Sequence, residues 1–227
     1  MRIIKLNKVV YRVQNNATQF LNGLTSNKLD RPNNAFLNIH GKVIAVFDQL
    51  KISDDHFILA IEHAFEQAVL QHIDRYARLS KTTFKKEEHY KAYFDLEASA
   101  PVEAEDFIIL QKKGRLVLST RNLDSTISEE EFTLFRIQNA IAVHGVDYKD
   151  EFLLNVSDQE GDLVSFTKGC FLGQEPVSKV HNRSQPSWKL IVRYEDKCTP
   201  EEKVKMTSRV VEPQTKRVQG FVFVANR

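Results

Sequence analysis

The residues best suited to chemistry lie close together, between Ser165 and Glu175. Within this segment Lys168 precedes Cys170 by two positions and Gly169 separates them. A cysteine reacts as its thiolate, and a nearby cation such as Lys168 favours that form. Gly169 and Gly173 allow backbone conformations that other residues avoid, so a tight turn could present the thiol to solvent. The same pattern is compatible with a buried Cys170 that acts as a small apolar side chain, and spacing alone does not decide between the two.

The run from Lys168 to Glu175 resembles the K-G-C-[YF]-x-G-Q-E signature of the YgfZ-type folate-binding proteins, with every fixed position matched. These proteins are relatives of the glycine cleavage T-protein, an aminomethyltransferase, and they support the assembly and maturation of iron–sulfur clusters. The resemblance implies that Cys170 is a reactive thiol or a transient metal or sulfur contact, activated by Lys168. It implies a catalytic or a loop-holding role for Glu175, and hydrogen bonds from Gln174 that fix the loop. It also places four residues of this loop beside tetrahydrofolate: Gly169, Phe171, Gly173 and Gln174.

Three residues outside the loop extend the resemblance. Asp48 follows the apolar run 43–47, where a carboxylate must face solvent, pair with another group or contact a ligand. It is similar to an aspartate that lies beside the folate in the T-protein and its relatives; the alternative is an outward-facing side chain. Arg136 and Gln138 resemble the family's R-[IL]-E run, again implying folate contacts. Gln138 replaces the usual glutamate and Ala140 the usual glycine, which predicts a weaker hold on a pterin, since an amide both donates and accepts.

Composition indicates a soluble globular protein of 227 residues, with 42% apolar and 27% charged side chains and a net charge of +2. This length accommodates one large domain or two to three small ones. The two cysteines, Cys170 and Cys198, are too few for a disulfide framework or for a cluster held by four thiolates, so a reducing, cytoplasmic location is expected. The sequence shows no signal peptide, no apolar run of about 20 residues and no zinc-site spacing. We therefore expect no membrane partner and no resident metal.

Apolar periodicity predicts an α+β fold with antiparallel sheets packed by helices. Helices are predicted at 17–24, 63–79 and 128–141, the first capped by Asn15 or Asn16 and the third opened by a capping box at 128–131. Strands are predicted at 5–13, 35–39, 43–52, 56–61, 90–96, 107–110, 116–119, 188–194, 204–211 and 218–224, of which those in 35–61 form a meander. Residues 82–88 read as a charged connector, and Pro176 is predicted to stop any helix that reaches it.

The resemblance implies a T-protein-like fold of several subdomains. Residues 1–185 form the folate-binding region, with a ferredoxin-like subdomain around 85–145, and residues 186–227 form a short C-terminal β segment, an abbreviated form of a β-barrel-like element.

Three functions remain open at this stage. The first is a folate-linked accessory protein for iron–sulfur enzymes, including tRNA-modifying ones, with client enzymes or assembly factors as partners. The second is a one-carbon transferase like the T-protein, which lacks the motif cysteine. The third is a family member that binds partners or tRNA without folate. Basic clusters at 81–86 and 203–217 are consistent with a solvated surface or an RNA contact.

Overall fold

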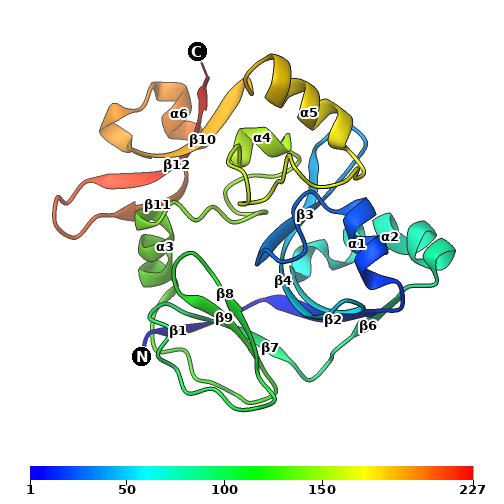
Figure 1. Ribbon diagram of the computed structural model, residues 1–227. Helices are drawn as coiled ribbons and strands as arrows, with labels where there is room; N and C mark the ends of the chain where they lie inside the picture. The colour runs from blue at the N-terminus through cyan, green and yellow to red at the C-terminus, as the bar shows by residue number, and fades with distance from the viewer. Residues whose placement is uncertain (227) are drawn as a thin grey trace.

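The computed structural model describes residues 1–226 as three antiparallel sheets with helices packed against them. Figure 1 shows the N-terminal half forming two of these sheets and the C-terminal strands forming the third at the far side of the molecule. The predicted α+β class is confirmed. None of the helices in the described residues is both long and apolar enough to span a bilayer.

The largest sheet has five strands in the order β3-β4-β5-β2-β6. Its strands are β2 (Lys8–Gln14), β3 (Asn33–Leu37), β4 (Val43–Ser53), β5 (His56–Glu62) and β6 (Thr83–Lys86). The predicted meander is confirmed, because β3, β4 and β5 pair consecutively and antiparallel. The connector predicted at 82–88 is wrong, since β6 pairs with β2 there. Phe84 anchors β6 by packing on Tyr11, with ring centroids 4.7 Å apart.

Two helices, α1 (Ala17–Leu24) and α2 (Glu66–Ser80), cover one face of this sheet (Figure 1). A 3-10 turn, His63–Phe65, leads into α2. The helices bury Phe20, Leu21 and Val69 against sheet residues that include Phe36 and Phe47. Both helices are confirmed, because their apolar side chains recur on one face.

The start of α1 depends on a distant residue. Asn16 precedes the helix with φ of +59° and makes no capping bond with its side chain. Instead, the carboxylate of Asp55, in the turn between β4 and β5, accepts the N–H of Ala17 at 2.6 Å and that of Asn15 at 3.0 Å. The predicted asparagine cap is therefore wrong, because a side chain from another turn satisfies these N–H groups.

The second sheet has four strands in the order β1-β7-β9-β8. They are β1 (Ile3–Leu6), β7 (Lys91–Asp95), β8 (Phe107–Leu110) and β9 (Arg115–Ser119). The single strand predicted at 5–13 is in fact two strands, because the chain leaves one sheet after β1 and enters the other at β2. Apolar residues of both sheets, among them Val10, Ile58, Ile109 and Leu118, form a shared core.

Helix α3 (Glu129–Gln138) begins at the predicted capping box. Ser128 accepts the N–H of Glu131 at 3.2 Å, and the Glu131 carboxylate accepts the N–H of Ser128 at 3.0 Å. The helix ends at Gln138 rather than Ile141, because Ala140 takes a left-handed φ of +52° and turns the chain away.

The C-terminal segment forms a three-stranded sheet in the order β10-β12-β11. It contains β10 (Trp188–Tyr194), a 3-10 turn Glu195–Lys197, α6 (Pro200–Lys205), β11 (Thr207–Val211) and β12 (Val218–Ala225). Within residues 1–226 this sheet does not close into a barrel. The strand predicted at 204–211 begins later, because Val204 belongs to α6 and is 87% exposed.

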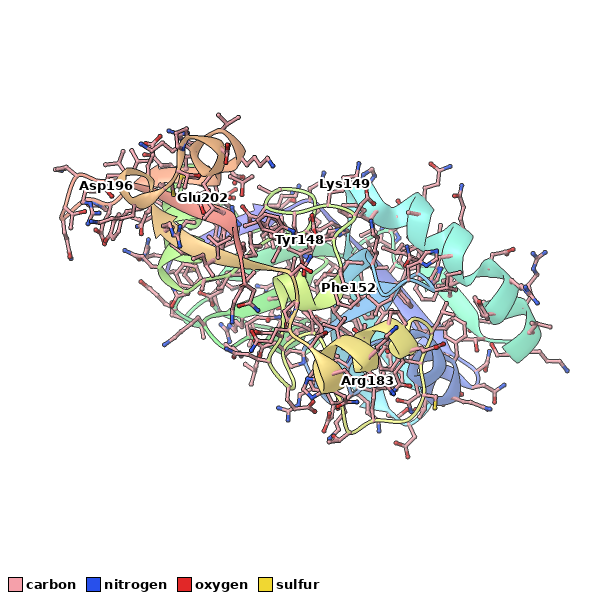
Figure 2. The ribbon with its side chains drawn as sticks, turned by 90° about the horizontal axis from the view of Figure 1, so that it is seen from above. Tyr148, Lys149, Phe152, Arg183, Asp196 and Glu202 are labelled. Carbon is pink, nitrogen blue, oxygen red and sulfur yellow. The ribbon has the colours of Figure 1, made fainter. Side chains whose placement is uncertain are left out.

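Two short helices, α4 (Leu153–Val156) and α5 (Gln174–Arg183), lie between β3 and the C-terminal strand β10 (Figure 1). Their apolar side chains join Leu37 and Val43 of the large sheet in a second core on its other face. Figure 2 shows Tyr148 and Phe152, which belong to this core, in the middle of the molecule, with Arg183 of α5 to one side and Asp196 and Glu202 at the C-terminal end. The predicted division into 1–185, with a subdomain at 85–145, and 186–227 stays a prediction.

Candidate functional site

A buried polar network fixes the segment that leads into the cysteine. The side-chain amide of Asn27 donates to the carbonyl oxygens of Asn33 at 3.0 Å, Gly161 at 3.2 Å and Asp162 at 3.1 Å. The N–H of Ser165 then bonds to the carbonyl of Ser26 at 2.9 Å. The loop after α1 is thus tied to residues 161–165, which are far apart from it in sequence. No sequence motif indicates this network; its one signal is that Asn27 lies between two apolar elements, where a polar side chain needs partners.

Residues 165–173, here called the thiol loop, continue from this network and dock on the end of α1. The Lys168 amino group donates to the carbonyl oxygen of Asn22 at 3.1 Å and also to that of Thr25. The N–H of Leu172 donates to the carbonyl of Gly23 at 2.9 Å. These contacts satisfy carbonyl groups that a helix leaves unpaired in its last turn. The described contacts of the Lys168 amino group are with these carbonyls and with the Phe171 ring, so the expected activation of the thiol by this lysine stays a prediction.

The C-terminal side of the loop is held by burial. Phe171 is 7% exposed and packs with Leu37 and Val177 in the second core. Gly173 has φ of +83°, and a Cβ atom there would lie 2.4 Å from the carbonyl oxygen of Asn38. Only glycine fits this position. Gly169 differs, because a Cβ atom there would meet nothing within 4 Å.

Between these anchors Cys170 is exposed to solvent, which rules out the buried alternative. The other cysteine, Cys198, is partly buried, and its thiol lies 3.3 Å from the carbonyl oxygen of Tyr194. Burial and the nearby Glu202 raise the pKa of the Cys198 thiol. Cys170 is therefore the accessible thiol, whereas Cys198 is partly buried.

Helix α5 begins directly after the thiol loop, with Gly173 at its N-cap. The prediction that Pro176 prevents a helix is wrong, because this proline lies in the first turn, where its missing N–H costs no helical bond. Gln174 and Glu175 are the first two helical residues, and Glu175 is exposed. Their side chains make no hydrogen bond within residues 1–226, so Lys168, Phe171 and Gly173 hold the loop instead. An acidic residue in this first turn is favoured by the helix dipole.

Asp48 is buried on β4 rather than facing outward, and it is fully engaged. Its carboxylate accepts hydrogen bonds from the amides of Asn33 and Gln111, both at 2.9 Å, and pairs with the Lys8 amino group at 3.0 Å. Lys8 also pairs with Glu62 at 2.5 Å. Burial alone would lower the pKa of Lys8, but the two carboxylates outweigh it and raise that pKa.

Arg136 is also committed to other partners. The residue is 5% exposed. Its guanidinium donates to the carboxylate of Asp147 at 2.7 Å and to the hydroxyl of Ser208 at 2.7 Å. Asp147 further accepts the hydroxyl of Thr207 at 2.9 Å. This pair joins α3 to β11 of the C-terminal sheet. Gln138 is exposed at the end of α3 and makes no side-chain hydrogen bond in the part of the chain that the structure describes.

The residues expected to contact folate are each held by different partners. Asp48 lies against Lys8, Arg136 lies against the C-terminal sheet, and the thiol loop lies on α1. The carboxylate of Asp48 and the guanidinium of Arg136 are thus engaged within the chain, and the prediction that they contact folate stays a prediction. The structure also contains no group of three metal-binding side chains within residues 1–226.

Two hollows lie near the thiol loop, and neither is lined by Asp48, Arg136 or Cys170. One, of about 570 Å³, runs between α1 and α2 and has Gly23, Leu79 and Leu172 among its walls. The other, of about 350 Å³, lies at the end of α5 beside His181 and Lys189. Leu172, in the wall of the first hollow, follows Cys170 by two positions in the chain.

A buried imidazole lies on the other side of the second core. His144 is 4% exposed and stacks on Phe65, with ring centroids 3.9 Å apart. Neither ring nitrogen has a hydrogen-bond partner within residues 1–226. Burial lowers the pKa of His144 to about 4, a fall that Asp150 partly opposes and Lys149 reinforces.

Comparisons with known proteins give a fold but no family. No family model matches the chain. It is 25% identical over 148 residues to an uncharacterized protein of Haemophilus influenzae, an alignment that covers 63% of this chain and spans about half (52%) of the relative's length. The structure is similar to the crystal structure of glycine cleavage system aminomethyltransferase T from Bartonella henselae, with a TM-score of 0.70 and 12% identity, over 98% of this chain and 78% of that one. The chain thus has a T-protein-like fold, as the resemblance of its sequence implied.

Proposed function

We propose that this chain is a YgfZ-type accessory protein that acts in the assembly or repair of iron–sulfur enzymes, with Cys170 as its functional thiol. The observation that carries the proposal is the exposed Cys170 on a loop anchored at both ends. An exposed thiol on an ordered loop suits contact with a sulfur or metal atom carried by a client, because the loop does not have to be ordered at each binding event.

Three residues have separate roles in the proposed function. Cys170 makes the contact to the client atom, Lys168 ties the loop to α1, and Gly173 allows the close approach to β3. With two cysteines in the chain, the protein does not hold a cluster by the usual four thiolates. Clients in the proposal are cytoplasmic iron–sulfur enzymes, including tRNA-modifying ones, or their assembly factors.

Folate binding belongs to the proposal through the T-protein-like fold and the Lys168–Glu175 signature. Asp48 and Arg136 are already paired within the chain, so the proposed function does not require tetrahydrofolate to take part in any step. The pairing favours a second candidate, a partner-binding module of the same fold that does not use folate. Calorimetric titration with tetrahydrofolate separates the two: saturable heat at micromolar ligand supports folate binding, and no heat at high micromolar ligand supports the second candidate.

Complementation tests the proposed function directly. A strain that lacks its YgfZ-type protein should recover iron–sulfur enzyme activity with the wild-type chain and with Cys198→Ala, but not with Cys170→Ala. Equal folding of the variants is checked by circular dichroism. Full rescue by Cys170→Ala would refute the role of the thiol. Formation of methylene-tetrahydrofolate from a lipoyl-carried aminomethyl group would instead establish a one-carbon transferase.

A further inference from the structure

The end of α1 is completed by the thiol loop rather than by its own sequence. The carbonyl oxygens of Asn22 and Thr25 both accept from the Lys168 amino group, and the carbonyl of Gly23 accepts the N–H of Leu172 at 2.9 Å. These are carbonyls at the negative end of the helix dipole, where a cation is favoured. One lysine and one backbone N–H thus cap the helix from a segment more than 140 residues later.

The surroundings of the Lys168 amino group show that its partners are these carbonyls. It lies 5.2 Å from the centre of the Phe171 ring. Glu160 and Asp162 precede the loop in the chain, and Cys170 lies on it. Glu160 is occupied by the hydroxyl of Ser165 and the N–H of Phe166, and no ion pair to Lys168 is present among residues 1–226.

We propose that Lys168 is a positioning residue, which fixes the Cys170 thiol by capping the C-terminal end of α1 and does not act on the thiol itself. The proposal rests on the proposed function, because it explains how the functional thiol is held in place. It replaces the activating role that the resemblance implies for this lysine. Its consequence is that loss of the amino group releases the loop from α1 while leaving Cys170 as exposed as before.

The first test separates positioning from activation. In a Cys198→Ser background, Lys168→Met keeps an unbranched apolar stem but removes the ammonium. We expect hydrogen exchange of the Leu172 amide to accelerate by at least about tenfold, since two charge-assisted bonds are lost. We expect the rate of Cys170 alkylation by iodoacetamide at pH 7 to stay equal or rise. Alkylation that slows about tenfold while amide exchange is unchanged would overturn the proposal, as would no change in either.

The second test is rescue by a conservative variant, which packing of the apolar stem alone does not predict. Lys168→Arg keeps a charged group with N–H donors for the carbonyl oxygens of Asn22 and Thr25. Protection of the Leu172 amide in Lys168→Arg should lie closer to that of the wild-type protein than to that of Lys168→Met.

Equally fast exchange in Lys168→Arg and Lys168→Met would contradict the proposal, because it would mean that donors at this position do not hold the loop on α1. These measurements need no activity, so their failure would leave the complementation test of Cys170 untouched, and failure of complementation would leave the positioning role standing.

Discussion

The buried imidazole of His144 predicts a loss of stability in mild acid. Its pKa falls from an ordinary 6.5 to about 4, chiefly through burial. The unfolded chain therefore binds this proton more tightly than the folded protein does. The contribution is fully present above pH 6.5 and is lost as the pH falls from 6.5 to about 4. The full difference corresponds to about 3 kcal/mol, of which roughly 2 kcal/mol is lost between pH 7 and pH 5.

Urea unfolding of the wild-type protein and of His144→Phe, each at pH 7 and pH 5, measures this loss. Phenylalanine keeps the stack on Phe65 and does not titrate. The free energy of unfolding of the wild-type protein should fall by about 2 kcal/mol more than that of His144→Phe. The pKa values of His72 and His56 are also lowered, by burial first, but both residues are present in the two proteins and cancel.

The control for this experiment is His89→Phe, at a histidine that is exposed on the surface. Its pH dependence should match that of the wild-type protein. Equal losses of stability in wild-type protein and His144→Phe between pH 7 and pH 5 would refute the reasoning, because they would mean that the folded protein accommodates a charged imidazole at this site.

Three further predictions follow from the site. Cys170 should react with iodoacetamide at pH 7 at least about tenfold faster than Cys198, because the latter is partly buried with a raised pKa; equal rates measured by mass spectrometry would contradict this. Gly173→Ala should lower the free energy of unfolding by at least about 2 kcal/mol, whereas Gly169→Ala should change it by less than about 0.5 kcal/mol, and similar urea midpoints would refute the difference. Arg136→Met should cost roughly 3 kcal/mol in the same assay, because it strands a buried carboxylate; a loss below about 1 kcal/mol would show that the pair is dispensable.

Much of the sheet structure could be predicted because its signals are local. Apolar alternation and turn residues between 35 and 61 define the three strands of the meander, and the spacing of Phe20, Leu21 and Leu24 defines the face of α1. The break between β1 and β2 has no such signal, because apolar residues recur on both sides of Asn7 while the chain changes sheets there. Helix α5 is not predicted either, since Pro176 is compatible with a first turn once Gly173 starts the helix.

The candidate site was predictable only in part, because residue types reveal chemistry but not partners. The exposure of Cys170 agrees with its glycine-flanked segment. The partners of Lys168 and Arg136, in contrast, come from α1 and from residues 147 and 208, and no short-range pattern brings these together. The roles suggested by resemblance assumed that such side chains remain free for a ligand. In this chain they are used to join segments of the fold.

Phe171 and Leu172 are adjacent in the chain, yet they pack in different cores: Phe171 with the helices beside the C-terminal sheet, and Leu172 against the groove of α1 and α2. The segment that follows Cys170 therefore lies at the boundary between the two cores. The direction of the sulfur is therefore set by the relative position of the two cores, because the backbone next to Cys170 is held by side chains that pack in both.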